Sequence, residues 1–203
     1  DLPSYIMEDK FDFAYAVLFA VVATFFGWVF IFCTKFLKSV FYKLNFPIYY
    51  KTLIGGIILG IIAFYFPITR YFGHHEINDL LLTDFDFEFL VAILLVKILA
   101  IAITVTSGWR GGFIIPLFFV GASLGLIIHQ LFPSTNLSLA VVTSMAAINA
   151  CVTRTPMSTT ILLATLTVFG YFIPILFASL TGYFLAPRIP FISSQGDKEN
   201  AVK

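Results

Sequence analysis

Charged side chains are scarce in this 203-residue sequence: Asp, Glu, Lys and Arg make up 11% of it, and hydrophobic residues make up 60%. The mean hydropathy is +0.98. A soluble domain carries about a quarter charged residues, so the composition predicts an integral membrane protein. The formal net charge is +1, and no basic stripe occurs outside one loop, so we expect no nucleic-acid partner.

Motifs for catalysis and metal binding are also lacking. The sequence has no HExxH, no GxSxG and no phosphate-cradling lysine loop, so we expect neither an enzyme nor a cofactor. Its two cysteines, Cys33 and Cys151, lie in apolar runs, where a thiol behaves as a small hydrophobe. His74 and His75 precede Glu76, but adjacent histidines point apart on a helix. We therefore expect a pH-sensitive vestibule or a plain polar loop there, and no metal site.

The first of several long apolar runs covers residues 13–34, about the length that spans a bilayer. Four lysines follow it: Lys35, Lys38, Lys43 and Lys51. No acidic residue occurs from position 13 to position 75, whereas residues 73–88 are rich in carboxylates. The positive-inside rule then predicts that segment 35–51 is cytoplasmic and that the 73–88 loop is external.

The later apolar segments are short and are interrupted by glycine or proline. They are residues 52–66, 89–106, 117–131, 137–152, 157–168 and 175–185. Half-length or re-entrant helices are tolerated in a membrane only where they line a cavity within protein. The pattern therefore predicts an all-α polytopic protein with broken and re-entrant helices, as in a channel or transporter. Gly56 and Gly60 add a weak helix-packing signal by their small-xxx-small spacing.

The most informative break is the glycine-rich stretch that separates segments 89–106 and 117–131. It reads Ser107, Gly108, Trp109, Arg110, Gly111, Gly112, Phe113, Ile114, Ile115, Pro116. No helix continues through so many Gly and Pro residues without penalty, but Pro116 suits the first turn of the next helix. A helix that begins inside a membrane directs unpaired N–H groups and its positive dipole end forward. The stretch therefore predicts an anion site, or half of one.

Two cations accompany this stretch. Lys97 lies at the centre of an apolar run, where an ammonium must face protein, carbonyls or water. It is either a structural cation bonded to a neighbouring helix end or a contributor to anion attraction. Arg110 either adds positive potential near the anion route or sits in the aqueous mouth.

Three ordered segments resemble the CLC chloride channel and transporter family. They are the Gly-Phe-Ile-Ile-Pro start and small-residue pattern of residues 112–125, the Met-Ala-Ala to Val-Thr-Arg-Thr-Pro-Met-Ser stretch of residues 145–158, and, more loosely, residues 54–73. The resemblance covers almost the whole chain. It implies that residues 1–187 are the C-terminal half of a CLC transmembrane domain, half of an inverted-repeat fold. The polar composition predicts that residues 188–203 are a disordered tail.

The resemblance also implies a site and partners. The backbone amides of Phe113 and Ile114 would face a chloride-like anion, within a loop made by Ser107, Gly108, Gly111, Gly112, Ile115 and Pro116. Segments 157–168 and 172–186 would form a homodimer interface. The implied function is a chloride channel or chloride/proton antiporter, multi-pass in the cell membrane.

Parts of the family pattern are missing from this sequence. Its Gly-Ser-Gly-x-Pro and Gly-Arg-Glu-Gly-Pro motifs do not occur, and no tyrosine-bearing helix follows Pro190. The sequence also begins without Met in a linker-like stretch, so we expect a missing N-terminal half as a partner. One alternative is a non-conducting subunit or scaffold; the glycine cluster favours an anion site over it. Another is a fluoride exporter, but that branch usually has Glu and Thr where Phe113 and Ile115 stand.

Overall fold

The computed structural model of the chain describes residues 10–43, 46–70, 74–83, 85–109, 111–167, 169–189 and 191. Within them, the chain forms eight α-helices, two 3₁₀ turns and no strand. In chain order these are α1 (Lys10–Lys43), α2 (Ile48–Tyr65), η1 (Pro67–Thr69), α3 (His74–Leu82), α4 (Phe87–Thr106), α5 (Ile114–Leu131), α6 (Leu137–Thr153), α7 (Pro156–Leu166), η2 (Phe169–Tyr171) and α8 (Phe172–Phe184). The predicted all-α class is confirmed.

Four of the helices are long and apolar enough to cross a membrane: α1 from Ala14 onward, α2, α4 and α5. Helices α6, α7 and α8 are apolar but shorter. The predicted mixture of full-length and short apolar helices is therefore present. It follows from the positions of proline and glycine, which end the runs before they reach a membrane-spanning length.

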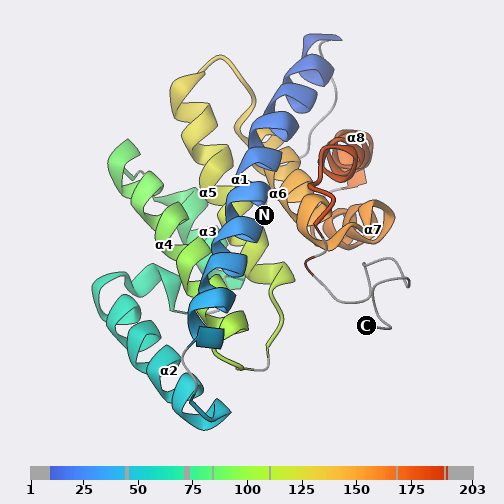
Figure 1. Cartoon of the computed structure of the whole chain (residues 1–203). Coiled ribbons are helices and arrows are strands. Elements are labelled where there is room, and N and C mark those ends of the chain that lie inside the picture. The colour runs from blue at the N-terminus through green and yellow to red at the C-terminus, as the bar shows by residue number, and fades with distance from the viewer. Residues whose placement is uncertain are drawn as a thin grey trace.

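Helix α6 is the centre of the fold, because every residue from Ser138 to Thr153 is buried. It packs against α5, α1 and α8, and Figure 1 shows it between these helices. Its alanines allow this close packing on several sides at once. A helix that is apolar all round belongs in the interior of a membrane protein or a large core.

Glycines bring α5 and α8 against α6 at backbone distance. A Cβ atom added at Gly121 would lie 2.4 Å from Met145 Cα, and one added at Gly125 would lie 2.4 Å from Val141 Cα. A Cβ at Gly182 of α8 would lie 2.3 Å from the Ala147 carbonyl oxygen. Only residues without a Cβ fit at these three crossings.

Helix α2 lies at one edge of the fold, and α7 and α8 lie at another (Figure 1). The glycine that brings α2 into close contact is Gly55, where an added Cβ would lie 2.4 Å from Ser107 Oγ. An added Cβ at Gly60 would have no described atom within 4 Å. The closest contact of α2 with the described helices therefore uses Gly55, and helix packing through Gly56 and Gly60 stays a prediction.

The segment predicted as the external loop 73–88 contains a helix, α3, and this part of the prediction is wrong. Its apolar residues Ile77, Leu80 and Leu81 are spaced for one helix face, and Leu80 is buried in the core. In the sequence, this apolar spacing is hard to recognise because carboxylates and histidines surround the three residues. The side chains of His74, His75 and Glu76 lie outside the described residues.

Two helix boundaries also differ from the sequence-based segments. Helix α5 begins at Ile114, three residues before the predicted apolar run. Helix α8 begins at Phe172, so Pro174 lies inside its first turn and does not interrupt the chain. Proline is tolerated at both positions because the first N–H groups of a helix have no intrahelical acceptor.

Candidate anion site

The glycine-rich stretch joins the end of α4 to the start of α5. The Ser107 N–H donates to the Ile103 carbonyl at 2.9 Å and closes α4. Gly108 then adopts φ +92°, a left-handed conformation that favours glycine. This turn ends α4 and redirects the chain toward the start of α5.

Helix α2 holds this turn in place. The Thr52 hydroxyl donates to the Ser107 carbonyl at 2.9 Å, and the Trp109 indole N–H donates to the Thr52 carbonyl at 3.1 Å. The close approach of Gly55 leaves Ser107 buried. Ser107 is thus a packing residue of the loop, which the motif alone did not reveal.

The first N–H groups of α5 have no acceptor among the described residues. Its first helical hydrogen bond runs from the Leu117 N–H to the Phe113 carbonyl at 3.0 Å. The N–H groups of Ile114 and Ile115 precede that bond, and Pro116 has none. Phe113 forms no side-chain cap. Gly111, Gly112 and both isoleucines are exposed, so the positive end of the helix dipole faces open space.

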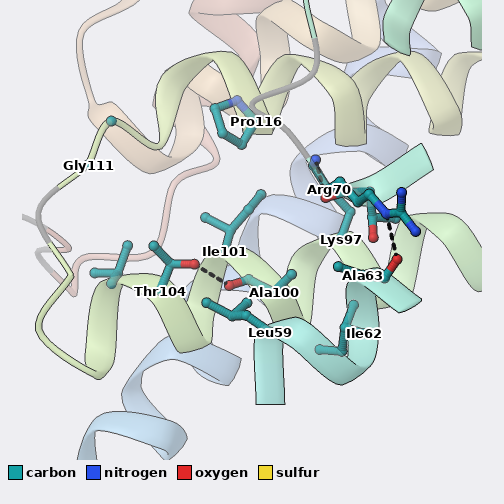
Figure 2. Close-up of a pocket in the computed structure, with 13 residues that line it drawn as sticks. Leu59, Ile62, Ala63, Arg70, Lys97, Ala100, Ile101, Thr104, Gly111 and Pro116 are labelled. Atoms are coloured by element: carbon teal, nitrogen blue, oxygen red, sulfur yellow. Dashed lines mark hydrogen bonds between the residues drawn. The ribbon is translucent and has the colours of Figure 1, made fainter. Parts of the chain in front are cut away.

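A cavity of about 240 Å³ adjoins this helix start. Gly111 and Pro116 lie on one side of it, and residues of α2 and α4 lie on the other, as Figure 2 shows; Gly112 also lines it. Arg70 and Lys97 also line it. The fold therefore gathers two cationic side chains and the start of α5 around a single space.

Arg70 is a residue that the sequence analysis did not single out. It follows η1, and its Nε donates to the Ala63 carbonyl near the end of α2 at 2.8 Å (Figure 2). The only signal was a cation directly after a Pro-terminated apolar run. Arg110, the cation of the glycine-rich stretch, lies outside the described residues.

Lys97 is almost fully buried, with an exposed fraction of 2%. Its Nζ donates to the Thr69 carbonyl at 3.0 Å and lies 4.8 Å from the centroid of the Phe119 ring. These contacts fit the structural alternative, a cation bonded to a neighbouring helix end. Because the same side chain lines the cavity, its charge also acts on that space.

Replacing Lys97 by methionine is expected to destabilise the protein. The change leaves the Thr69 carbonyl without this charged donor, at a cost of roughly 1.5–3 kcal/mol. Thermal unfolding of the purified protein measures the effect, and Lys97→Arg, which keeps a donor and a charge, serves as the control. Equal melting temperatures for Lys97→Met and the unsubstituted protein would contradict the structural role.

The end of the described chain also reaches the start of α5. The ring of Phe191 lies 5.0 Å from that of Phe113 and 5.3 Å from that of Phe30, measured between centroids. Phe191 is thus packed against the fold, although it lies within the segment 188–203 that was predicted to be a tail. Residues 190 and 192–203 lie outside the described residues, and the domain boundary stays a prediction.

Comparison with known proteins identifies the family. A sequence model of the voltage gated chloride channel family matches residues 4–187. The chain belongs to the CLC family. The predicted resemblance is therefore confirmed over almost the full length, and with it the chain's place among the ion channels and transporters of the membrane.

Curated relatives of this CLC chain are 28–29% identical to it over the aligned residues. An uncharacterised protein of Methanocaldococcus jannaschii is 29% identical over 172 residues, which is 85% of this chain and 43% of that protein. YfeO of Escherichia coli, an ion-transport protein by name, is 28% identical over 70% of this chain and 34% of its own length. The chain thus spans less than half the length of these relatives.

A solved structure supports the fold. The crystal structure of a CLC-type fluoride/proton antiporter matches with a TM-score of 0.78 and 18% sequence identity. The match covers 96% of this CLC chain and 49% of the antiporter chain. At this identity, the likeness concerns the arrangement of helices and not the transported ion.

Proposed function

We propose that this chain is the C-terminal half of a CLC subunit that carries chloride or a similar small anion across the cell membrane. The observation that supports the proposal best is the open start of α5 beside a cavity lined by Arg70 and Lys97. In this proposal, the backbone amides of Phe113 and Ile114 contact the anion. The glycine-rich loop keeps side chains away from it, since Gly111 and Gly112 have no Cβ.

The mechanism needs no covalent chemistry and no cofactor. Backbone N–H groups replace part of the hydration shell of the anion, and their partial charges hold it less tightly than full charges in contact would. Arg70 and Lys97 raise the local anion concentration through their field. We therefore infer a transporter or channel and not an enzyme.

The remaining parts of the ion path belong to partners in this proposal. A missing N-terminal half would supply the gating and proton-transferring glutamates, which decide between a channel and a chloride/proton antiporter. A second copy would pack on α7 and α8, corresponding to predicted segments 157–168 and 172–186. Both helices have large exposed apolar residues, namely Met157, Ile161, Leu166, Ile173 and Phe184. Covering such a surface favours association.

Ion flux from liposomes that contain the complete subunit tests the function. We expect chloride efflux well above that of protein-free liposomes, and a roughly two- to fivefold weaker chloride affinity in Arg70→Gln, since the charge acts from an exposed position. Arg188→Gln, which removes an exposed charge outside the cavity, is the matched control. Fluoride efflux without chloride efflux would favour the fluoride exporter. The absence of both would favour the scaffold.

A further inference from the structure

A second cavity, of about 190 Å³, lies where the C-terminal ends of α1 and α4 meet. It is lined by Thr34, Lys35, Lys38, Val105, Thr106 and Phe191. Lys35 and Lys38 are exposed, and their i, i+3 spacing places them on neighbouring positions of α1. The transport mechanism above makes no use of this cavity.

Within the described part of the chain, the carboxylates of α1 and α4, the helices that supply most of the cavity lining, lie far from it. Among the residues that the structure describes, the acidic ones are confined to the beginnings of α1 and α4 and to α3. Along α1, about 35 Å separates Asp12 from Lys35, and along α4 about 25 Å separates Glu88 from Val105. Both separations exceed the Debye length of about 8 Å at physiological ionic strength. The two ammonium groups therefore create a locally positive site.

The hydrogen-bonding capacity of the cavity suits a phosphate group. The Thr34 hydroxyl donates to the Phe30 carbonyl at 2.9 Å, and the Thr106 hydroxyl donates to the Ala102 carbonyl at 2.7 Å. Both hydroxyl protons are thus already used, which leaves the ammonium groups as the side-chain donors. Each ammonium has three N–H bonds, and together they match an oxyanion with several acceptor oxygens.

The position along α1 indicates that this oxyanion belongs to a lipid. The apolar run 13–34 covers roughly 33 Å of helix, close to the hydrocarbon thickness of a bilayer. Lys35 and Lys38 follow directly and so reach the headgroup layer.

We propose that the cavity between the ends of α1 and α4 binds the phosphate of an anionic phospholipid through Lys35 and Lys38. Basic pockets between transmembrane helices recognise lipid headgroups in this way. Lys35 and Lys38 line this cavity and do not line the one at the start of α5.

Native mass spectrometry of the complete subunit in detergent tests this site. The protein is titrated with phosphatidylglycerol, with phosphatidylcholine and with inorganic phosphate. We expect preferential binding of phosphatidylglycerol, and a loss on the order of 30-fold in its affinity for the double variant Lys35→Gln, Lys38→Gln. Lys43→Gln is the matched control, because Lys43 is exposed on the same end of α1 but does not line the cavity.

Three results would overturn the proposal. The first is unchanged phosphatidylglycerol binding in the double variant, and the second is an equal loss in Lys43→Gln, which would indicate a diffuse surface field. The third is binding of inorganic phosphate as tight as that of the lipid, which would assign the cavity to a free anion. The variant Lys35→Arg, Lys38→Arg keeps both charges, and retained lipid binding in it would separate loss of charge from loss of folding.

Discussion

Replacing Gly125 by alanine is expected to lower the free energy of unfolding by about 3 kcal/mol, the upper end of the usual cost of overpacking. The new Cβ would lie 2.4 Å from Val141 Cα, 2.6 Å from its N and 2.9 Å from the Ala140 carbonyl carbon. Because these are backbone atoms of the buried helix α6, no side-chain rotation relieves the clash. Helices α5 and α6 must move apart, and the start of α5 moves with them.

Gly60→Ala is the matched control for Gly125→Ala. An added Cβ at Gly60 has no described atom within 4 Å, and alanine in a helix is favoured over glycine by roughly 0.5–1 kcal/mol. Thermal unfolding in detergent should therefore show a melting temperature about 6–12 °C lower for Gly125→Ala, and an unchanged or higher one for Gly60→Ala. Equal stability of the two variants would mean that the α5–α6 crossing is not as close as described.

Replacing Ile114 by proline is expected to weaken anion binding roughly 10- to 100-fold. The change deletes one N–H at the start of α5, and a hydrogen bond to a charged partner contributes about 1.5–3 kcal/mol. Helix α5 itself loses no hydrogen bond, because its first helical hydrogen bond is donated by the Leu117 N–H. Isothermal titration calorimetry of the complete subunit with chloride measures the affinity.

Two further variants separate the missing N–H from other effects of proline. Ile114→Ala keeps the N–H and removes most of the side chain, so chloride affinity should change little. Incorporation of the α-hydroxy analogue of isoleucine at position 114 replaces the N–H by an ester oxygen without the restriction that proline places on Phe113. If the ester protein binds chloride as tightly as the unsubstituted protein, the assignment of this amide to the anion is wrong.

The local features of the site could be predicted from the sequence because they depend on neighbouring residues. Gly108 follows the end of α4, the Gly111-Gly112 pair precedes α5, and Pro116 fits the first turn of α5, as expected. A partner for Lys97 could be predicted because a charged side chain inside an apolar run must contact protein, carbonyls or water. The membrane class followed from composition, and the family from the order and spacing of its motifs.

The remaining features depend on contacts between distant segments, and no local pattern encodes them. Nothing in the sequence around Thr52 indicates that its hydroxyl donates to Ser107, 55 positions away. The same holds for Gly55, whose role becomes visible only where α2 meets Ser107. Arg70 reaches the cavity because η1 follows the end of α2. In the sequence alone, Arg70 cannot be distinguished from any other cation in a loop.

The anchoring of the glycine-rich stretch makes its stiffness uneven. Up to Trp109 the stretch is fastened to α2 through Thr52, whereas Gly111 and Gly112 have open space where a Cβ would lie, as far as the described atoms extend. Among the described residues of the stretch, backbone rotation is therefore easiest at this glycine pair, which precedes Phe113 and α5. Ions of different radius would be accommodated by small rotations at this glycine pair, while the ends of α2 and α4 stay fixed.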